Sequence, residues 1–334
     1  MKLLRYILFP IVPIYYIVTW IRNKMYDNGW KVSKSYDFPV ICVGNLSTGG
    51  TGKTPMVEYL IRLLKEDVKL ATLSRGYGRK SEGFQLGNTN SDAKDLGDEP
   101  FQFYNKFSED IIVAVDGNRQ EGISKLLNNN PKPEVVLLDD AFQHRKVKAG
   151  LNILLTTYNN QYTNDFVLPT GNLREPKNGA KRANIIVVTK CPINLSASKK
   201  QQILSKINPL SYQSVFFSSI SYSTIVIADN KIIEIDKLPN FKLVTGIANA
   251  KPLVDFLKDK NLNFEHLEFK DHHDFSTKEI EYIANNNCIV TTEKDYMRLK
   301  NEPSLNAKLY YLPIQVMIDK AEQFDAIVKS FALR

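Results

Sequence analysis

Several features are scarce in the sequence or absent from it, and each absence argues against a class of protein. Only three cysteines occur among 334 residues, at Cys42, Cys191 and Cys288. Cysteines so widely separated form neither a disulfide framework nor a metal site, and they suit a reducing compartment. The sequence has no internal repeat, no low-complexity tract, no helicase-like motif and no basic stripe interleaved with aromatic residues. A nucleic-acid partner is therefore not expected.

The composition is that of an ordinary globular protein with a surplus of positive charge. Apolar residues make up 43% and charged residues 24% of the chain, and the length suggests about two domains. The net charge of +8 favours an anionic partner. With nucleic acid disfavoured, an anionic membrane or a phosphorylated substrate remains.

The N-terminal segment 1–25 is strongly apolar. Its residues 6–21 carry no charge, have basic residues on both flanks and contain two prolines that would interrupt a regular helix. They are fewer than the roughly 20 residues that a membrane span needs. The basic flanks and the aromatic residues near one end favour a segment in the interface of an anionic leaflet. A buried core helix and a true span stay open as alternatives, but a removable signal peptide is not expected, since no small-residue cleavage site follows.

A glycine-rich turn follows the first apolar strand pattern. Residues 44–54 read GNLSTGGTGKT directly after Val40–Val43, and an amphipathic helical pattern begins near Pro55. In such a strand–turn–helix unit, backbone N–H groups wrap phosphate oxygens, the lysine reaches the terminal phosphates and the next hydroxyl can ligate Mg²⁺. The predicted nucleotide-binding residues are Thr48, Gly49, Gly50, Thr51, Gly52, Lys53 and Thr54.

This match to the P-loop pattern has one departure. In G-x-x-x-x-G-K-[ST], the first glycine would fall at Ser47. An ordinary glycine-rich turn is the alternative, but the strand, the glycines, the Lys-Thr pair and the helix all agree with a nucleotide site. A GTPase is disfavoured, because Thr189-Lys190-Cys191-Pro192 lacks the Asp of a guanine-recognising [NT]-K-x-D element.

Short apolar strands alternate with helical patterns between residues 40 and 190. The alternation predicts a P-loop NTPase-type α/β fold, with a mainly parallel sheet, helices on both faces and ligands beyond the carboxyl ends of the strands. The predicted elements include strands Val40–Val43, Lys69–Ser74, Ile111–Val115, Val135–Leu138, Ile153–Thr156 and Ile185–Thr189, and a helix Arg119–Leu127.

The pattern changes after residue 217. Residues 218–235 favour a two-stranded hairpin, after which strands and helices alternate again up to a final helix near residues 321–331. We therefore expect a P-loop kinase domain at 26–217, a hairpin linker and hinge at 218–236 and a smaller α/β domain at 237–334.

Acidic residues cluster in three places. Asp139-Asp140 end an apolar strand, which is typical of a Walker B site, and a divalent cation would relieve the repulsion between the two carboxylates. Asp98-Glu99 form a second pair on a loop. In Asp271-His272-His273-Asp274, a His and an Asp within hydrogen-bond reach could act as a general base. A solvated turn or a plain surface loop is the alternative for each cluster.

Two basic loops and one further cluster complete the candidates. Residues 74–79 read SRGYGR and residues 168–176 read LPTGNLREP, and arginine on such loops suits phosphate recognition. Tyr77 lies between two glycines and could stack on a base or a sugar. Gln143-His144-Arg145 could position a ligand, with a merely exposed histidine as the alternative. A basic surface loop is the alternative for the two loops.

Together these segments resemble one family, the tetraacyldisaccharide 4'-kinases of lipid A biosynthesis in Gram-negative bacteria. Between residues 44 and 299 the matching strings follow the family's order: GNLSTGGTGKTP, SRGYGR, GDEP, LDDAFQH, LPTGNLREP, VVTK, TGIAN, KDHHDF and TEKDYMRL. The chain departs from the family at Ala141, which is often glycine, at Asn172, which interrupts a common Gly-Pro-Leu-Arg run, and after Val147, where the stretch is divergent.

The resemblance implies transfer of the ATP γ-phosphoryl group to the 4'-hydroxyl of a tetraacylated disaccharide 1-phosphate. It implies ATP and Mg²⁺ as cofactors and peripheral attachment to the cytoplasmic face of the inner membrane; we expect a monomer. Asp98 and His272 would form the base dyad, with His273 as the alternate member, and nucleotide binding would close the hinge to assemble it. The remaining implied roles are metal binding by Thr54, Asp139, Asp140 and Glu99, nucleotide contact by Tyr77, and support by Arg75, Arg119, Gln143, His144, Arg174 and Glu175. A membrane-bound nucleotide-sensing or scaffold protein without kinase activity is the alternative.

Overall fold

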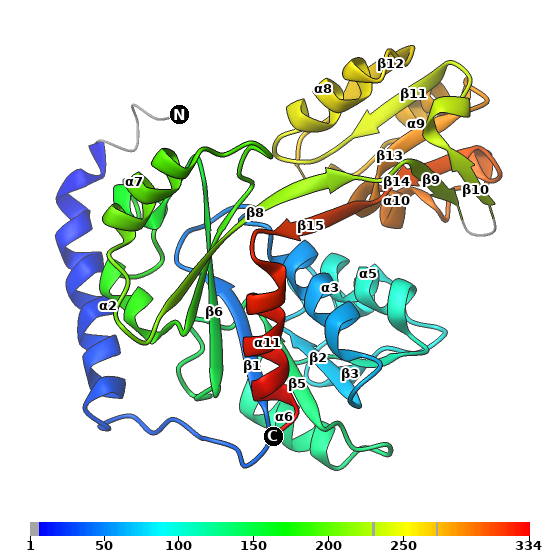
Figure 1. Cartoon of the computed structure of the whole chain (residues 1–334). Coiled ribbons are helices and arrows are strands. Elements are labelled where there is room, and N and C mark those ends of the chain that lie inside the picture. The colour runs from blue at the N-terminus through cyan, green and yellow to red at the C-terminus, as the bar shows by residue number, and fades with distance from the viewer. Residues whose placement is uncertain (1–6, 229–230, 272) are drawn as a thin grey trace.

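The computed structural model describes residues 7–228, 231–271 and 273–334. Two lobes, each built on its own sheet, are joined by two long strands, β8 (Ser214–Tyr222) and β15 (Ile314–Ile318) (Figure 1). The chain therefore passes between the lobes twice, and both passages pair with each other in antiparallel register.

The larger lobe contains a nine-stranded sheet with the order β15-β8-β7-β6-β1-β5-β2-β4-β3. Its strands from β8 to β4 run parallel, and β15 and β3 are antiparallel at the two edges. The predicted mainly parallel sheet is thereby confirmed. The remaining strands of this sheet are β1 (Val40–Asn45), β2 (Leu70–Ser74), β3 (Gln85–Leu86), β4 (Ile111–Val115), β5 (Val135–Asp139), β6 (Leu151–Thr157) and β7 (Ile185–Thr189).

Both faces of this sheet are buried, as the near-continuous apolar strands require. Successive side chains of a strand point to opposite faces, and along β1 Val40 and Cys42 join one core while Ile41 and Val43 join the other. Helices α6 (Arg119–Leu127) and α7 (Ala197–Ile207) cover the first face. The second face is covered by α3 (Lys53–Leu64), α5 (Asp98–Phe107) and α11 (Ala321–Ala332).

The smaller lobe contains a six-stranded sheet with the order β10-β9-β14-β13-β11-β12, in which β14 to β12 are parallel. Its strands are β9 (Ile225–Ala228), β10 (Lys231–Glu234), β11 (Phe241–Thr245), β12 (Phe264–Glu268), β13 (Ile289–Thr292) and β14 (Leu309–Leu312), and its helices are α8 (Lys251–Asp259), α9 (Thr277–Ala284) and α10 (Glu293–Leu299). Short helices elsewhere are α4 (Ala93–Leu96) and the 3₁₀ turns Phe9–Ile11, Tyr162–Asn164, Lys177–Arg182, Ile235–Lys237 and Pro303–Leu305.

The structure divides the chain differently from the expected boundaries. The hairpin consists of β9 and β10 and belongs to the small sheet, whereas residues 218–222 continue β8 of the large sheet. At the other end, β15 and α11 return to the large lobe, where Phe324 and Val328 pack in the same core as α3. A hydrophobic pattern fixes the type of an element, but it does not reveal which of two sheets the element joins. The two-strand connection was therefore missed.

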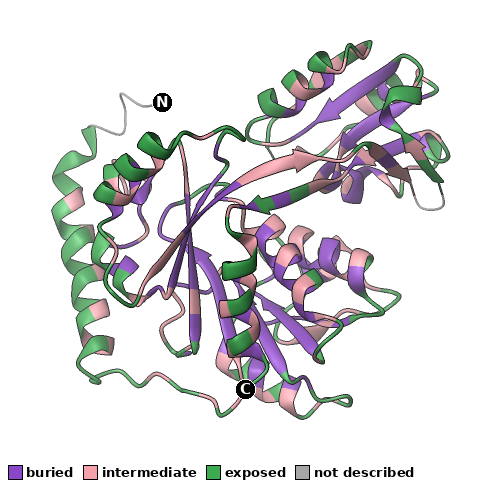
Figure 2. Cartoon of the chain, viewed as in Figure 1, coloured by how far each residue is buried: buried purple, intermediate pink, exposed green. Residues whose placement is uncertain are grey.

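Helix α2 (Val12–Asp27) lies along the outside of the large lobe (Figures 1 and 2). None of its residues is buried, so the alternative of a buried core helix is wrong. Pro10 lies in the preceding 3₁₀ turn and Pro13 in the first turn of α2, where a missing N–H costs nothing. No helix within the described residues is long and apolar enough to cross a membrane.

Candidate active site

The glycine-rich turn connects the carboxyl end of β1 to the N-terminus of α3. Gly49 and Gly52 have φ values of 102° and 86°, a left-handed region in which glycine avoids the cost of a Cβ. Helix α3 begins at Lys53, so its first backbone N–H groups and the positive end of its dipole face the turn. Ser47 is absent from the positive-φ residues, which explains why this position does not need the usual glycine.

Hydrogen bonds hold the turn from several sides. The Asn45 amide donates to the Thr51 hydroxyl at 2.8 Å, and the Thr189 hydroxyl donates to the Thr51 carbonyl at 2.8 Å. Lys190 donates to the Gly50 carbonyl at 2.7 Å, and the Thr48 N–H donates to the carbonyl of residue 172 at 2.8 Å. The turn is therefore held in place by β1, by the end of β7 and by the loop at residue 172.

Two carboxylates end β5 next to this turn. Asp139 is buried and accepts a hydrogen bond from the Ser74 hydroxyl at 3.3 Å. Burial, with the Asp140 and Glu99 charges adding to it, raises the pKa of Asp139 to about 7. Asp140 lies 3.6 Å from the Lys53 ammonium and 3.1 Å from the Arg174 guanidinium. Two cations, Lys53 and Arg174, and two acids, Asp139 and Asp140, thus lie close together beside the glycine-rich turn.

These acids suit a divalent cation. The Asp139 Oδ1 atom is buried and has no hydrogen-bond partner within the described part of the chain, as expected for an oxygen that awaits a ligand. No group of three or more His, Cys, Asp or Glu among the described residues could hold a metal ion by itself. Mg²⁺ commonly takes one or two carboxylates together with substrate phosphates and water, so the residues fit a nucleotide-dependent magnesium site.

Two predicted supporting residues are partly or fully buried on the first face of the sheet. Arg119 is 3% exposed, and its guanidinium donates to the Gly117 carbonyl at 3.1 Å; burial lowers its pKa. Burial, reinforced by Arg119 and neighbouring cations that include Arg75, lowers the pKa of His144 to about 4. His144 is therefore neutral near pH 7.

Glu175 lies at the centre of a buried network that links α2 to the site. Its carboxylate accepts from Gln143 at 3.0 Å, from Arg182 at 2.7 Å and from Asn23 of α2 at 2.6 Å. Tyr15 of the same helix donates to the carbonyl of Arg174 at 3.0 Å. The predicted supporting residues Gln143 and Glu175 thus fasten α2 to the loop that carries Arg174.

The second acidic pair faces the small lobe. Asp98 and Glu99 begin α5, and each contacts a cation on α10: Asp98 forms an ion pair with Arg298, and Glu99 lies 3.8 Å from Lys294. Lys294 also lies 3.9 Å from Asp271 of the KDHHDF segment. The structure therefore brings Asp98, Glu99 and Asp271 to one boundary between the lobes.

The two histidines of this segment stand differently. His272 lies outside the described residues. His273 contacts Glu279 at 3.1 Å and stacks on Phe269, with ring centroids 4.8 Å apart, so its ring is held within the small lobe. Hydrogen bonds from the Ser276 backbone and hydroxyl lower the pKa of Glu279 to about 2, and the hydrogen bond with His273 makes a smaller contribution.

Sequence reasoning did not single out Arg298 and Lys294. Both lie in the string TEKDYMRL, and they are four residues apart on a helix, a spacing that places side chains on one face. That spacing was the signal that could have found them.

Comparison with known proteins places the chain in a family. Residues 4–332 match the family model described as Tetraacyldisaccharide-1-P 4'-kinase. The tetraacyldisaccharide 4'-kinases of Flavobacterium johnsoniae and Bacteroides thetaiotaomicron are 54% and 44% identical to it, over 99% and 95% of this chain and 98% and 90% of theirs. This chain belongs to the tetraacyldisaccharide 4'-kinase family.

A solved structure of this kinase family supports the same conclusion. LpxK from Aquifex aeolicus, described as an "apo" form in complex with ATP, has a TM-score of 0.79 and 29% identity. The match covers 98% of this chain and 99% of that one. The resemblance to a lipid A kinase family and the predicted fold class are therefore confirmed.

One departure from the 4'-kinase pattern has a structural explanation. The Asn172 side-chain amide donates to the Asp165 carboxylate at 3.0 Å, and the backbone carbonyl of Asn172 accepts the N–H of Thr48 in the glycine-rich turn. The asparagine therefore helps to fix the loop that carries Arg174 against the turn.

Two other features lie apart from these contacts. Tyr77 is 78% exposed between two glycines, and its contact with a nucleotide stays a prediction.

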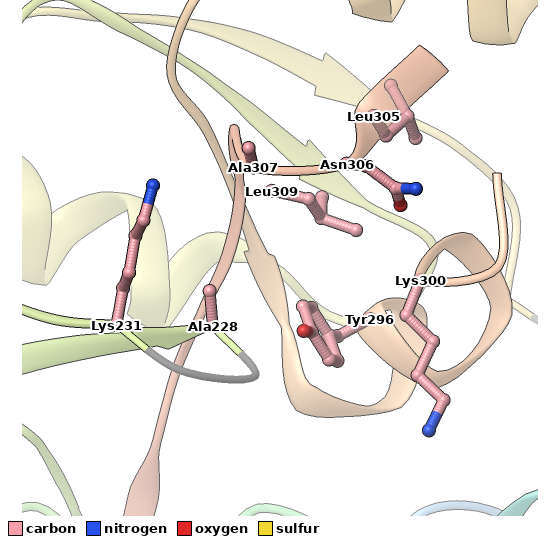
Figure 3. Close-up of a pocket in the computed structure, with 8 residues that line it drawn as sticks. All are labelled: Ala228, Lys231, Tyr296, Lys300, Leu305, Asn306, Ala307 and Leu309. Atoms are coloured by element: carbon pink, nitrogen blue, oxygen red, sulfur yellow. The ribbon is translucent and has the colours of Figure 1, made fainter. Parts of the chain in front are cut away.

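A pocket of about 280 Å³ in the small lobe (Figure 3) contains none of the predicted site residues, so it is not part of the candidate site. It is lined by Ala228, Lys231, Tyr296, Lys300, Leu305, Asn306, Ala307 and Leu309.

Proposed function

We propose that this protein transfers the γ-phosphoryl group of ATP to the 4'-hydroxyl of tetraacyldisaccharide 1-phosphate in lipid A biosynthesis. One observation carries the proposal: Lys53, Arg174, Asp139 and Asp140 converge at the glycine-rich turn. Phosphoryl transfer needs positioning and charge neutralisation more than covalent chemistry. Family membership supplies the choice of acceptor.

The charged residues at the turn take separate roles in this proposal. The N–H groups of the turn and the Lys53 ammonium bind the β- and γ-phosphates, and Arg174 neutralises charge that develops during transfer. Thr54, Asp139, Asp140 and Glu99 would hold Mg²⁺, which would supply positive charge that neutralises the phosphates. Asp140 forms ion pairs with both Lys53 and Arg174. Nucleotide binding would replace these ion pairs with contacts between the two cations and the phosphates.

We assign the base to Asp98 and His272, with His273 as the alternate partner. The acceptor hydroxyl is a poor nucleophile, and a His oriented by a carboxylate can take its proton as the new P–O bond forms. The bond between the γ-phosphorus and the bridging oxygen breaks in the same step, and ADP leaves with that oxygen. Asp98 lies at the boundary with the small lobe, which carries the 271–274 segment. Approach of the lobes upon nucleotide binding, guided by the β8 and β15 connection, would bring the dyad together.

The outer face of α2 suits a membrane surface. Ile14, Ile17 and Val18 are at least half exposed, whereas Arg22 and Asn23 of the helix donate hydrogen bonds to the large lobe. A groove of about 200 Å³ runs between α2 and the 165–178 loop. We propose that α2 rests in the cytoplasmic leaflet of the inner membrane, that the acyl chains of the substrate stay in the lipid and that the protein acts as a monomer.

Transfer of ³²P from ATP to tetraacyldisaccharide 1-phosphate in detergent micelles tests the proposal. Wild type should transfer phosphate, and Lys53→Ala, Asp98→Ala and His272→Ala should lose most activity, whereas Lys125→Ala, in an exposed pair with Glu121, should not. Absence of transfer despite ATP binding would overturn the kinase assignment and favour the nucleotide-sensing or scaffold alternative.

A further inference from the structure

A buried cluster of charges lies behind the phosphate-binding turn. Glu58 follows Lys53 by five residues on α3, and its side chain is 3% exposed. It accepts hydrogen bonds from Gln102 at 2.7 Å and Lys106 at 2.6 Å, both on α5, and from Arg62 at 3.0 Å. A buried carboxylate that accepts hydrogen bonds from three donors is held rigidly. Glu58 therefore anchors α3, the helix that follows the glycine-rich turn.

Lys106 extends this cluster into the small lobe. Its ammonium lies 2.5 Å from the carboxylate of Glu293, the first residue of α10, whose side chain is 6% exposed. Lys106 is itself 13% exposed. One ammonium therefore stands between two buried carboxylates that belong to different lobes.

The three most buried groups of this cluster, two carboxylates and one ammonium, carry an excess of negative charge, and the fourth group, Arg62, is more exposed. Glu58 and Glu293 face one another through Lys106, and Arg62 contacts Glu58 from a more exposed position. Burial raises the pKa of Glu293 to about 7, and the negative charge of Glu58 is the second largest cause. The charges of Lys106 and Arg62 oppose this shift. Removing one partner of such a cluster leaves a buried charge without compensation, which costs far more than the cluster gains.

We propose that Lys106 is a positioning residue, which joins the helix of the nucleotide site to α10 and so sets where the small lobe presents its side chains. The same helix α10 places Lys294 beside Glu99 and Arg298 on Asp98. A shift of α10 would therefore move the cations that contact both acids of the second pair, without touching the glycine-rich turn. The kinetic part of this inference rests on the proposed kinase function, but the structural part does not.

Lys106→Met tests the inference, because it keeps the length of the side chain and removes its charge. The expected result is a fall in kcat of about tenfold or more, with the ATP dissociation constant changed by less than about twofold. Spin labels can be attached at the exposed positions Glu109→Cys and Glu281→Cys, one in each lobe. The distribution of distances between the two labels should be broader in the Lys106→Met protein than in the otherwise wild-type protein. The native cysteines are all buried.

Two further variants separate positioning from simple destabilisation. Lys106→Met with Glu293→Gln removes the uncompensated charge and should restore both the narrow distribution and most of kcat. In the single variant the distance distribution should narrow as the pH falls, because a protonated carboxylate no longer repels its neighbour. Lys65→Met, which breaks an exposed pair with Asp110 inside the large lobe, is the matched control and should change neither quantity.

Two outcomes would contradict the proposed positioning role of Lys106. A Lys106→Met protein that matches the Lys65→Met control, or a double variant no better than the single one, overturns the inference. If Lys106→Met does not fold, Glu293→Gln alone still tests it: the wild-type distribution should broaden as pH rises through about 7, and that of Glu293→Gln should not. Broadening in an otherwise inactive wild type would refute the kinase function and leave the junction standing.

Discussion

The phosphate half and the base half of the candidate site are built from different kinds of contact. Short, buried side chains such as Asn45, Thr51 and Thr189 hold the glycine-rich turn within one lobe. The half that we assign to the base contains Lys294 and Arg298, long side chains that reach across the boundary between the lobes. Ordering a long charged side chain costs about 2 kcal/mol of rotamer entropy, and a partly exposed ion pair returns about 1 kcal/mol or less.

This difference predicts that the phosphate site is preformed, whereas the base half is completed only when the lobes are correctly placed. Substitutions in the two halves should then separate ATP binding from turnover.

The largest effect is expected at Lys53. Lys53→Met removes the cation that now lies beside Asp140 and would contact the terminal phosphates. We expect a fall in kcat/KM of about a thousandfold together with weaker ATP binding, measured by ADP formation and by calorimetry. A variant that binds ATP as wild type does would contradict a phosphate-binding role for Lys53.

A smaller effect confined to turnover is expected at Arg298. Arg298→Ala removes the ion pair between Arg298 and Asp98, so kcat should fall about tenfold to a hundredfold, with the ATP affinity nearly unchanged. Arg298→Lys should recover part of the loss. If ATP affinity fell in step with kcat, the two halves would not be separable as proposed.

The apolar face of α2 should affect membrane attachment rather than the site. Replacing Ile14, Ile17 and Val18 by serine removes exposed apolar surface, and partitioning onto anionic vesicles should fall about tenfold or more. Activity toward substrate in detergent should fall much less. Unchanged sedimentation with vesicles would disprove the interfacial role.

The smallest effect concerns stability and has a defined pH dependence. The pKa of Asp139 is raised from 3.8 to about 7 in the folded protein, so between these values the folded state binds more protons than the unfolded state. Its contribution to stability is therefore fully present below about pH 4 and is lost as the pH rises through 7. In the absence of metal and nucleotide, Asp139→Asn should make the melting temperature less dependent on pH in this window. An unchanged slope would show that Asp139 is not the group responsible.

Local sequence predicted most of the large lobe, because its elements are short, strongly patterned and adjacent in the chain. The strands Ile111–Val115 and Ile185–Thr189 and the helix Arg119–Leu127 occur with the predicted bounds. The edge pairing of β15 and the packing of α11 were beyond such reasoning, since their partners lie about a hundred or more residues earlier.

The sequence by itself determined the glycine-rich turn, the acidic strand end and the family. Each of these depends on a contiguous string whose spacing sets its local geometry, as in the glycines that adopt positive φ before Lys53. Only the tertiary structure decided which cations meet the acids: Arg174 on Asp140, Arg298 on Asp98, and Lys106 between Glu58 and Glu293. A pattern along the chain reports local conformation, whereas an ion pair between distant residues arises only when packing brings their elements together.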